Sequence, residues 1–333
     1  MLKRIIAGVF VVLTFFQSVE LNAVKYTAAD LPIIDGKVYH LQLTPEQLAP
    51  NIIIVGDPDR VPVLANHCLL PVDRFDVSHR GLRTITGITP SGLRVSIVTS
   101  GMGTPSTEIV LNELIVLNEI DLQTSERRAV PLYETLNIIR LGTSGALQST
   151  TKLGIPIITE YTVGLDNTGL FYDVPATDET TRLEYLFKQA IDKVTRPFDR
   201  FCGKIHPYAA KASQEIVEAL FCAAAEEDVE VIKGITVSSA GFFANQGRDI
   251  SRVKLTVPNI DRVCSEIVFE ELKAENMEME ASFICHFGGA LGCRTGAICP
   301  VIAHRREDTF YADYEDAVLD SLKIIIKAFE KLS

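Results

Sequence analysis

The chain has 333 residues, of which 47% are hydrophobic, enough for one large domain or two smaller ones around a sizeable core. The formal net charge of −11 argues against a general nucleic-acid binder or a binder of anionic membranes, because both need a basic face. An anionic small ligand remains compatible with this charge where a few arginines converge. The seven cysteines form no CxxC pair, which argues against structural zinc and favours free thiols in a reducing compartment.

The N-terminus is laid out like a secretory signal peptide. Lys3 and Arg4 precede an uncharged apolar run over residues 5–16, and Ala23 follows a short polar stretch. The run is too short to span a bilayer comfortably, so we expect no stable membrane span. The alternative is an extension outside the fold, from a start codon assigned too early, and the cysteine usage favours it. We therefore expect residues 1–30 to extend a cytoplasmic protein, or an exported one if residues 1–23 act as a signal peptide.

Predicted strands and helices alternate from residue 31 to residue 333. Apolar, β-branched segments predict strands covered on both faces, at 52–55, 83–88, 94–99, 137–141, 155–159, 229–237 and 295–302. One helix is predicted after Arg60, with others at 106–120, 178–194, 212–227, 259–274, 281–289 and 311–331. Ser106 is placed to cap the helix that it begins. The alternation predicts an α/β fold, and because no flexible linker divides it, a single domain over residues 31–333.

Three predicted strands run into polar loops that are rich in glycine: "GDPDR" from Gly56, "SGMGTPS" from Ser100 and "GTSG" from Gly142. In α/β sheets, ligands gather at the carboxyl ends of strands. Glycine lets backbone N–H groups approach an anion, and a following helix N-terminus favours negative charge. Each loop alone would also serve as a tight turn, and none has the Walker or the full dinucleotide-binding pattern.

Arginine stands next to these loops. Arg60 closes the first loop, Arg140 immediately precedes the third, and Arg80 lies between two predicted strands. The planar guanidinium binds phosphate oxygens in pairs. One such arginine alone would be an ordinary surface charge, whereas two that flank glycine loops at strand ends indicate an oxyanion site.

Two later segments suit a nucleoside better than a plain anion. In "SSAGFFANQGRD", Phe242 can stack on a flat ring, while Gln246 and Arg248 can bind the edge of a heterocycle. In "NMEMEASF", the carboxylates are strong acceptors for a vicinal diol, and methionine offers a soft apolar surface. Taken singly, the first segment would be a surface loop and the second a helix start whose dipole stabilises a carboxylate.

Together these motifs resemble a known family. The segments "YHLQLTP", "VGDPDRV", "SHRG", "TSGMGTPST", "RLGTSGALQ", "GFFANQGR" and "MEMEAS" follow the order found in nucleoside phosphorylase family 1, the purine and uridine phosphorylases, and cover residues 33–303. The match is most similar to the uridine phosphorylase type. It implies a single α/β domain with a mixed, partly barrel-like central sheet flanked by helices. It further implies no cofactor, and homodimers that build hexamers as trimers of dimers, with active sites shared across the dimer interface.

The resemblance also assigns the site residues. It implies that a neighbouring subunit supplies Arg80 to the phosphate and His40 to the 5′-hydroxyl of the nucleoside. The phosphate site that it implies consists of Gly56, Arg60, Arg80, Arg140 and Thr143. The nucleoside site that it implies, with Met279 and Glu280 on the ribose and the next three on the base, consists of His40, Thr143, Met279, Glu280, Phe242, Gln246 and Arg248.

The implied reaction converts uridine and phosphate to uracil and ribose 1-phosphate. As the C1′–N bond breaks, the ribose gains positive charge and the base gains negative charge. Arg140 would hold the phosphate that stabilises the ribosyl cation, and Gln246 and Arg248 would stabilise the charge on the pyrimidine oxygens. These three are the candidate catalytic residues, and the reaction needs no protein nucleophile and no metal.

Three alternatives stay open. A purine nucleoside phosphorylase shares the phosphate site, but the resembling purine enzymes place an aspartate directly after the last strand, where this chain has residues 303–306 and reaches a carboxylate only at 307–308. A hydrolytic nucleosidase of the same superfamily would use water and would not need three arginines. An exported nucleoside-binding protein without catalysis would explain the signal-like N-terminus.

Overall fold

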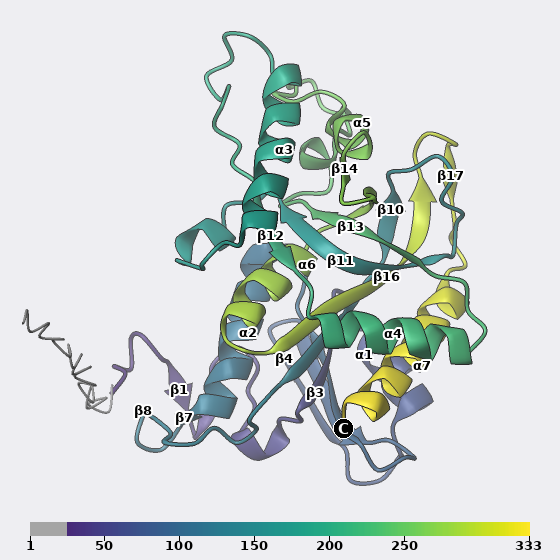
Figure 1. Ribbon diagram of the computed structural model, residues 1–333. Helices are drawn as coiled ribbons and strands as arrows, with labels where there is room; N and C mark the ends of the chain where they lie inside the picture. Colours follow the sequence, from purple (N-terminus) through teal and green to yellow (C-terminus); the bar gives the residue numbers. More distant parts are fainter. Residues whose placement is uncertain (1–24) are drawn as a thin grey trace, which may run out of the picture.

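The computed structural model describes residues 25–333 (Figure 1). The apolar run at 5–16, and with it the predicted signal peptide, lies outside the described residues. Where the described chain begins, Lys25 forms an isolated β-bridge with Glu126. No helix within residues 25–333 is long and apolar enough to cross a membrane.

One large mixed sheet forms the centre of the molecule (Figure 1). Its strands follow the order β12-β11-β13-β15-β10-β16-β9-β3-β6-β5-β4, and β11 also pairs with β16. This second pairing closes β11, β13, β15, β10 and β16 into a small barrel, from which β9, β3, β6, β5 and β4 continue as an open sheet. The strands are β1 Ile33–Ile34, β2 Lys37–Val38, β3 Asn51–Val55, β4 Phe75–His79, β5 Leu82–Ile88, β6 Arg94–Thr99, β7 Ile120–Asp121, β8 Glu126–Arg127, β9 Asn137–Leu141, β10 Ser144–Ala146, β11 Pro156–Gly164, β12 Tyr208–Lys211, β13 Ile232–Ser238, β14 Val268–Phe269, β15 Leu272–Glu278, β16 Arg294–His304 and β17 Thr309–Phe310.

Helices cover both faces of the open sheet and one side of the barrel. Helices α1, α4 and α7 share one buried cluster, α2 and α6 share a second on the opposite face, and α3 and α5 pack on the barrel strands. The helices are α1 Arg60–Cys68, α2 Thr104–Glu119, α3 Asp178–Val194, α4 Gln214–Glu226, α5 Ile260–Ser265, α6 Ala281–Phe283 and α7 Glu315–Leu332. Three single-turn 3₁₀ helices and a π turn complete them, at η1 Pro45–Gln47, η2 Gly169–Phe171, η3 Ala244–Gln246 and the π turn η4 Ile284–Gly288.

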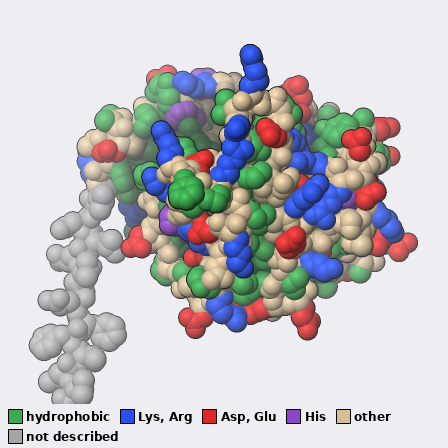
Figure 2. Space-filling view, turned by 90° about the horizontal axis from the view of Figure 1, so that it is seen from above, with side chains coloured by type: hydrophobic (Ala, Val, Ile, Leu, Met, Phe, Trp, Pro, Cys, Tyr) green, Lys and Arg blue, Asp and Glu red, His purple; other side chains and the backbone are tan. Residues whose placement is uncertain are grey.

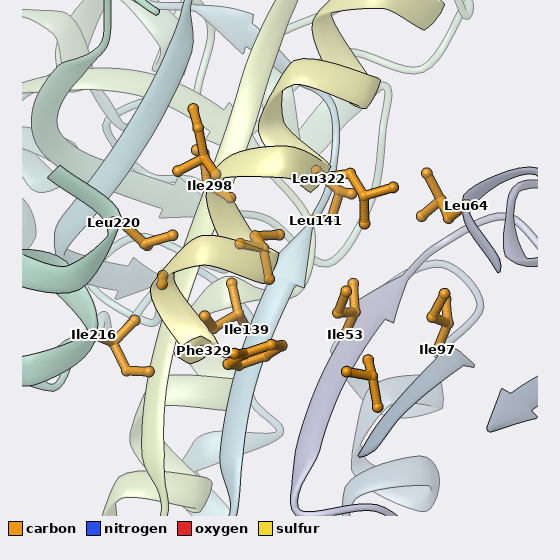
Figure 3. Packing of buried hydrophobic residues seen from close by; sticks show 14 of the residues in the cluster. Ile53, Leu64, Ile97, Ile139, Leu141, Ile216, Leu220, Ile298, Leu322 and Phe329 are labelled. Carbon is orange, nitrogen blue, oxygen red and sulfur yellow. The ribbon is translucent and has the colours of Figure 1, made fainter. Parts of the chain in front are cut away.

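Strand β3 shows why the central strands are mostly apolar on both faces. Ile53 and Val55 face the cluster that contains α7, whereas Ile52 and Ile54 face the cluster that contains α2. Figure 3 shows Phe329 and other α7 side chains in the first of these clusters, near the strands of the sheet. Because helices cover both faces, alternate residues have no solvent to face, and the strand loses the apolar–polar alternation of a half-exposed sheet.

The predicted fold is confirmed: the protein is α/β, with a mixed and partly barrel-like sheet flanked by helices. All seven predicted strands are present. Those at 94–99 and 137–141 match β6 and β9 at both ends, the other five have shifted ends, and the helix predicted at 178–194 matches α3 at both ends. Helix α1 confirms the helix predicted after Arg60. The segment 281–289 is split between α6 and the π turn that follows it, and the last helix begins at Glu315 instead of residue 311.

Two local predictions are wrong. The helix predicted at 259–274 ends at Ser265, because Glu270 and Glu271 have φ of 49° and 69° and turn the chain into the hairpin β14–β15. Ser106 does not cap α2. Gly103 is the N-cap, with φ of 89°, which glycine adopts without strain, and Ser106 Oγ donates a 2.5 Å hydrogen bond to the carbonyl of Ser100.

Candidate active site

A cavity of about 690 Å³ opens where the carboxyl ends of several strands meet. Strands β16, β9 and β3 run parallel to one another, so the loops that follow them lie at one edge of the sheet. The loop after β15 and the turn between β16 and β17 complete the wall. Nine of the predicted site residues line this cavity: Gly56, Arg60, Arg140, Thr143, Phe242, Gln246, Arg248, Met279 and Glu280.

Arg140 is the buried cation of this cavity. It leaves β9 with 4% exposure, and its Nε donates a 2.6 Å hydrogen bond to Oε2 of Glu278, while its Nη2 pairs with Glu280. The third nitrogen, Nη1, is buried and has no hydrogen-bond partner within residues 25–333. A Cβ added at Gly142 would lie 2.7 Å from Nη2, so glycine there makes room for the guanidinium. The arrangement leaves a donor that an anion would satisfy.

The charges around Arg140 depend on one another. Burial by itself would lower the pKa of Arg140, but Glu280 and then Glu278 outweigh it and raise the pKa above its usual value. Burial raises the pKa of the Glu280 carboxyl to about 7, against the opposing attraction of Arg140. Glu280 also accepts a 2.5 Å hydrogen bond from the backbone N–H of Gly103, at the start of α2. The arginine is thus held by two carboxylates, one of which changes its charge near neutral pH.

Of the two other arginines predicted for the phosphate site, Arg60 lines the cavity and Arg80 does not. Arg60, at the start of α1, lines the cavity, with its guanidinium 5.9 Å from the centre of the Tyr314 ring. Arg80 does not line the cavity. It sits in the turn between β4 and β5 and donates to the Tyr39 hydroxyl over 3.0 Å. His40 also lies outside the cavity wall, bound through Nδ1 to Glu113 at 2.7 Å.

The predicted base-binding residues form one compact unit. Gln246 is buried and donates from Nε2 to Oγ of Ser239 over 2.9 Å, while its Oε1 accepts from Nη1 of Arg248. The Arg248 guanidinium lies 3.8 Å from the centre of the half-exposed Phe242 ring. Burial, and then the nearby Arg305, lower the pKa of Arg248 from its usual value. The ring, the amide and the guanidinium therefore lie together on the cavity wall.

Two cavity residues make contacts that were not predicted from the sequence. Glu278 ends β15 and balances Arg140 across 138 positions of the chain. Arg305 donates from Nη2 to the carbonyl of Gly247 over 3.1 Å, pairs with Asp261 at 3.4 Å, and so fixes the loop that carries Gln246. No local pattern marks these partners, because each contact joins segments that are distant in sequence.

The turn after β16 contributes a carboxylate to the cavity wall. Although no carboxylate follows the strand directly, the turn brings Asp308 to the cavity wall. His304, the last residue of β16, is buried, with Nε2 2.9 Å from the carbonyl of Gln148 and Nδ1 accepting from the N–H of Glu307. Both ring nitrogens of His304 are therefore used to hold the turn.

A second hollow, of about 770 Å³, lies between α1 and α7. Lys323 and Lys327 on its wall already pair with Asp320 and Glu227. No predicted site residue lines it, so we place the site in the smaller cavity. Within residues 25–333, no group of three or more His, Cys, Asp or Glu side chains is arranged to hold a metal ion. On the face seen from above, basic side chains are mixed with acidic and apolar ones (Figure 2).

Comparisons with known proteins agree on one family. The model of the family described as the phosphorylase superfamily matches residues 50–330. The uridine phosphorylase of Thermococcus kodakarensis is 28% identical over 287 residues, which cover 86% of this chain and 84% of that protein. The DeoD-type purine nucleoside phosphorylase of Bacillus thuringiensis is 28% identical over 222 residues, which cover 61% and 87%. A Trypanosoma brucei nucleoside phosphorylase that shows uridine phosphorylase activity superposes with a TM-score of 0.82 at 30% identity, covering 91% of this chain and 100% of the other.

Proposed function

The chain belongs to the phosphorylase superfamily, and on that premise we propose that it cleaves uridine with inorganic phosphate to give uracil and ribose 1-phosphate. It is an enzyme of the pentosyltransferase type. The observation that carries the proposal is one cavity lined both by Arg140, whose buried Nη1 has no hydrogen-bond partner within residues 25–333, and by the Gln246–Arg248 pair. An anion and a base edge can therefore be held in one space.

The phosphate is placed at Arg140, Arg60 and Thr143. Arg140 is held rigidly by its two carboxylates, so its donors are oriented before the anion arrives. Phosphate bound there places negative charge beside the ribose as the C1′–N bond breaks, and then bonds to C1′. The glutamates have a second function, because Glu280 can accept hydrogen bonds from a ribose diol through lone pairs that Gly103 and Arg140 leave unused.

The base is placed against Phe242, with its polar edge at Gln246 and Arg248. The Gln246 amide has two N–H donors, and Ser239 takes one of them, which leaves a donor for a pyrimidine carbonyl. Arg248 exchanges its contact with Gln246 for the base as negative charge develops on the ring oxygens. Preorganised donors then stabilise the leaving group without a covalent intermediate.

A homodimer would complete the site. His40 and Arg80 lie outside the cavity of their own chain, and Met102 on the cavity wall is 81% exposed, which leaves the rim open to a second copy. We place these two residues in the cavity of a neighbouring subunit, where Arg80 would add a third guanidinium to the phosphate site, after Arg140 and Arg60. The hexamer implied by the sequence resemblance stays a prediction, as does the absence of a cofactor.

Purine nucleoside phosphorolysis is the second candidate. Asp308 lines the cavity near the base-binding loop, so a carboxylate is available there to a larger base. The purine nucleoside phosphorylase of Bacillus thuringiensis is also similar to this chain. The stronger match in length to uridine phosphorylases and the Gln246–Arg248 pair favour the pyrimidine.

A spectrophotometric assay of the purified chain tests both candidates. Uridine, thymidine, inosine and adenosine are each incubated with and without inorganic phosphate. We expect uracil to form from uridine with phosphate, and its rate to fall at least about 100-fold without it, since phosphate is the nucleophile. Equal rates with and without phosphate would identify a hydrolase. Faster cleavage of inosine than of uridine would favour the purine candidate. Nucleoside binding without turnover would show that the chain is a non-catalytic binding protein.

A further inference from the structure

The two site residues outside the cavity, His40 and Arg80, are joined on one surface. Nδ1 of His79 lies 3.0 Å from the carbonyl oxygen of His40, and Arg80 donates to the Tyr39 hydroxyl over 3.0 Å. The Arg80 guanidinium also lies 5.5 Å from the centre of the Tyr39 ring. The sequence neighbours Tyr39 and His40 therefore contact the sequence neighbours His79 and Arg80, with His79 on His40 and Arg80 on Tyr39. We call Tyr39, His40, His79 and Arg80 the His40–Arg80 cluster.

Glu113 anchors this cluster to α2. Its carboxylate is nearly buried, with 10% of the side chain exposed. Oε1 accepts from the backbone N–H of His40 at 2.8 Å and contacts the ring Nδ1 of His40 at 2.7 Å, while Oε2 accepts from the backbone N–H of Leu41 at 2.7 Å. One carboxylate thus fixes both the main chain and the ring of His40.

These contacts determine which ring nitrogen of His40 carries the proton. The two backbone groups can only donate, so the Glu113 oxygens act as acceptors and Nδ1 donates to them. In the neutral ring, Nε2 is then the acceptor. Nε2 has no hydrogen-bond partner among residues 25–333, and 29% of the His40 side chain is exposed. The acceptor nitrogen is therefore available to a group outside this chain.

We propose that Glu113 is a positioning residue that makes His40 an acceptor for the 5′-hydroxyl of the nucleoside bound in the neighbouring subunit. An alcohol donates its proton, so it needs an acceptor nitrogen at the position that Glu113 imposes. Glu113 thereby determines the preference for nucleosides with a 5′-hydroxyl over their 5′-deoxy analogues. This inference rests on the proposed function and adds a specificity-determining residue to it.

Helix α2 holds Glu113 in a fixed position. The first turn of α2 follows Gly103, whose N–H binds Glu280 in the chain's own cavity, and Glu113 lies ten positions further along the same helix. The rise of an α-helix places the two points about 15 Å apart. One rigid element therefore holds a ribose-side carboxylate for its own cavity and a histidine for the neighbouring one.

The test compares uridine with 5′-deoxyuridine in Glu113→Gln. Whichever way the new amide faces, its N–H group meets a donor of His40 or Leu41, so the ring is no longer held as before. We expect kcat/KM for uridine to fall about tenfold, while kcat/KM for 5′-deoxyuridine stays within about twofold. The ratio of kcat/KM for uridine to kcat/KM for 5′-deoxyuridine should also fall in His40→Ala. Adding Glu113→Gln to His40→Ala should lower this ratio no further.

Glu108→Gln is the matched control, because Glu108 lies on the same helix and binds the Tyr172 hydroxyl away from His40. It should leave the ratio unchanged. Equal losses on both substrates in Glu113→Gln, or no loss on either, would overturn the positioning role. If the wild type prefers inosine, the comparison with 5′-deoxyinosine has the same meaning, because the 5′-hydroxyl is shared. A wild type that cleaves no nucleoside would instead overturn the proposed function.

A measurement on the wild-type protein keeps the inference testable if Glu113→Gln does not fold. A two-bond ¹⁵N–¹H spectrum of the histidine rings, assigned with His40→Ala, reports the tautomer directly. We expect His40 to carry its proton on Nδ1. A ring protonated on Nε2 alone would contradict the proposal.

Discussion

Replacing Arg140 with alanine is expected to reduce kcat/KM for phosphorolysis by at least about 100-fold and to destabilise the protein. Removing one preorganised donor to a developing charge typically costs about 2.7–4 kcal/mol of barrier. The stability loss has a separate cause. Arg140 is buried between Glu278 and Glu280, and removal of one partner from a buried ion pair costs about 3–5 kcal/mol. Steady-state kinetics with phosphate as the varied substrate, together with thermal unfolding, measure the two effects.

Arg140→Lys separates the two effects. Lysine keeps the positive charge between the carboxylates, but its three donors are on one nitrogen, so it does not reach Glu278, Glu280 and an anion in the positions that the planar guanidinium spans. We expect this variant to regain much of the stability that alanine loses while remaining strongly impaired with phosphate. Near-normal turnover in either variant would place the anion elsewhere.

Gln246→Ala is expected to lower kcat/KM for uridine by about 100-fold, at the lower limit for loss of a preorganised donor. The ratio of uridine to inosine cleavage should fall with it, because the amide is placed to bind the pyrimidine edge. Gln246 is buried, and its loss also leaves Arg248 without the Oε1 partner that positions it in the ligand-free protein. Absorbance assays with each nucleoside at saturating phosphate give both values.

Asn245→Ala is the control for this prediction, since Asn245 is exposed in the same 3₁₀ turn. Its effect on both nucleosides should stay within about twofold, as for most exposed substitutions. If Gln246→Ala slowed both bases equally, the amide would support the loop without selecting the base.

The strands that build the cavity could be predicted because runs of mostly apolar residues in the sequence mark them as buried. Residues 52–55 are apolar without interruption, and in 137–141 the apolar residues are broken only by Asn137 and Arg140, as expected of strands covered on both faces. The hairpin after α5 could not be predicted in the same way, because the local pattern at 259–274 is helical and the reversal depends on two glutamates with positive φ. Tertiary pairing of β15 with β13 and β10 decides the outcome there.

The sequence indicated the parts of the candidate site but not its charge balance. The glycine loops and arginines indicated an anion site, and the structure brings most of them to one cavity. From sequence alone, Arg140 is a cation that could be removed at little cost to the fold. Its two buried carboxylate partners, Glu278 and Glu280, become visible only when the fold brings the end of β15 within reach of the Arg140 side chain on β9.

The carboxylate pair around Arg140 has a consequence for proton exchange with the solvent. An anion that enters beside Arg140 competes for its charge and repels Glu280, whose pKa near 7 then rises further. Anion binding near neutral pH therefore takes up a proton, and affinity declines as the solution becomes more alkaline. Sulfate keeps a constant charge over this range, so calorimetric titrations with sulfate in buffers of different ionisation heat should reveal a fractional uptake that Glu280→Gln abolishes.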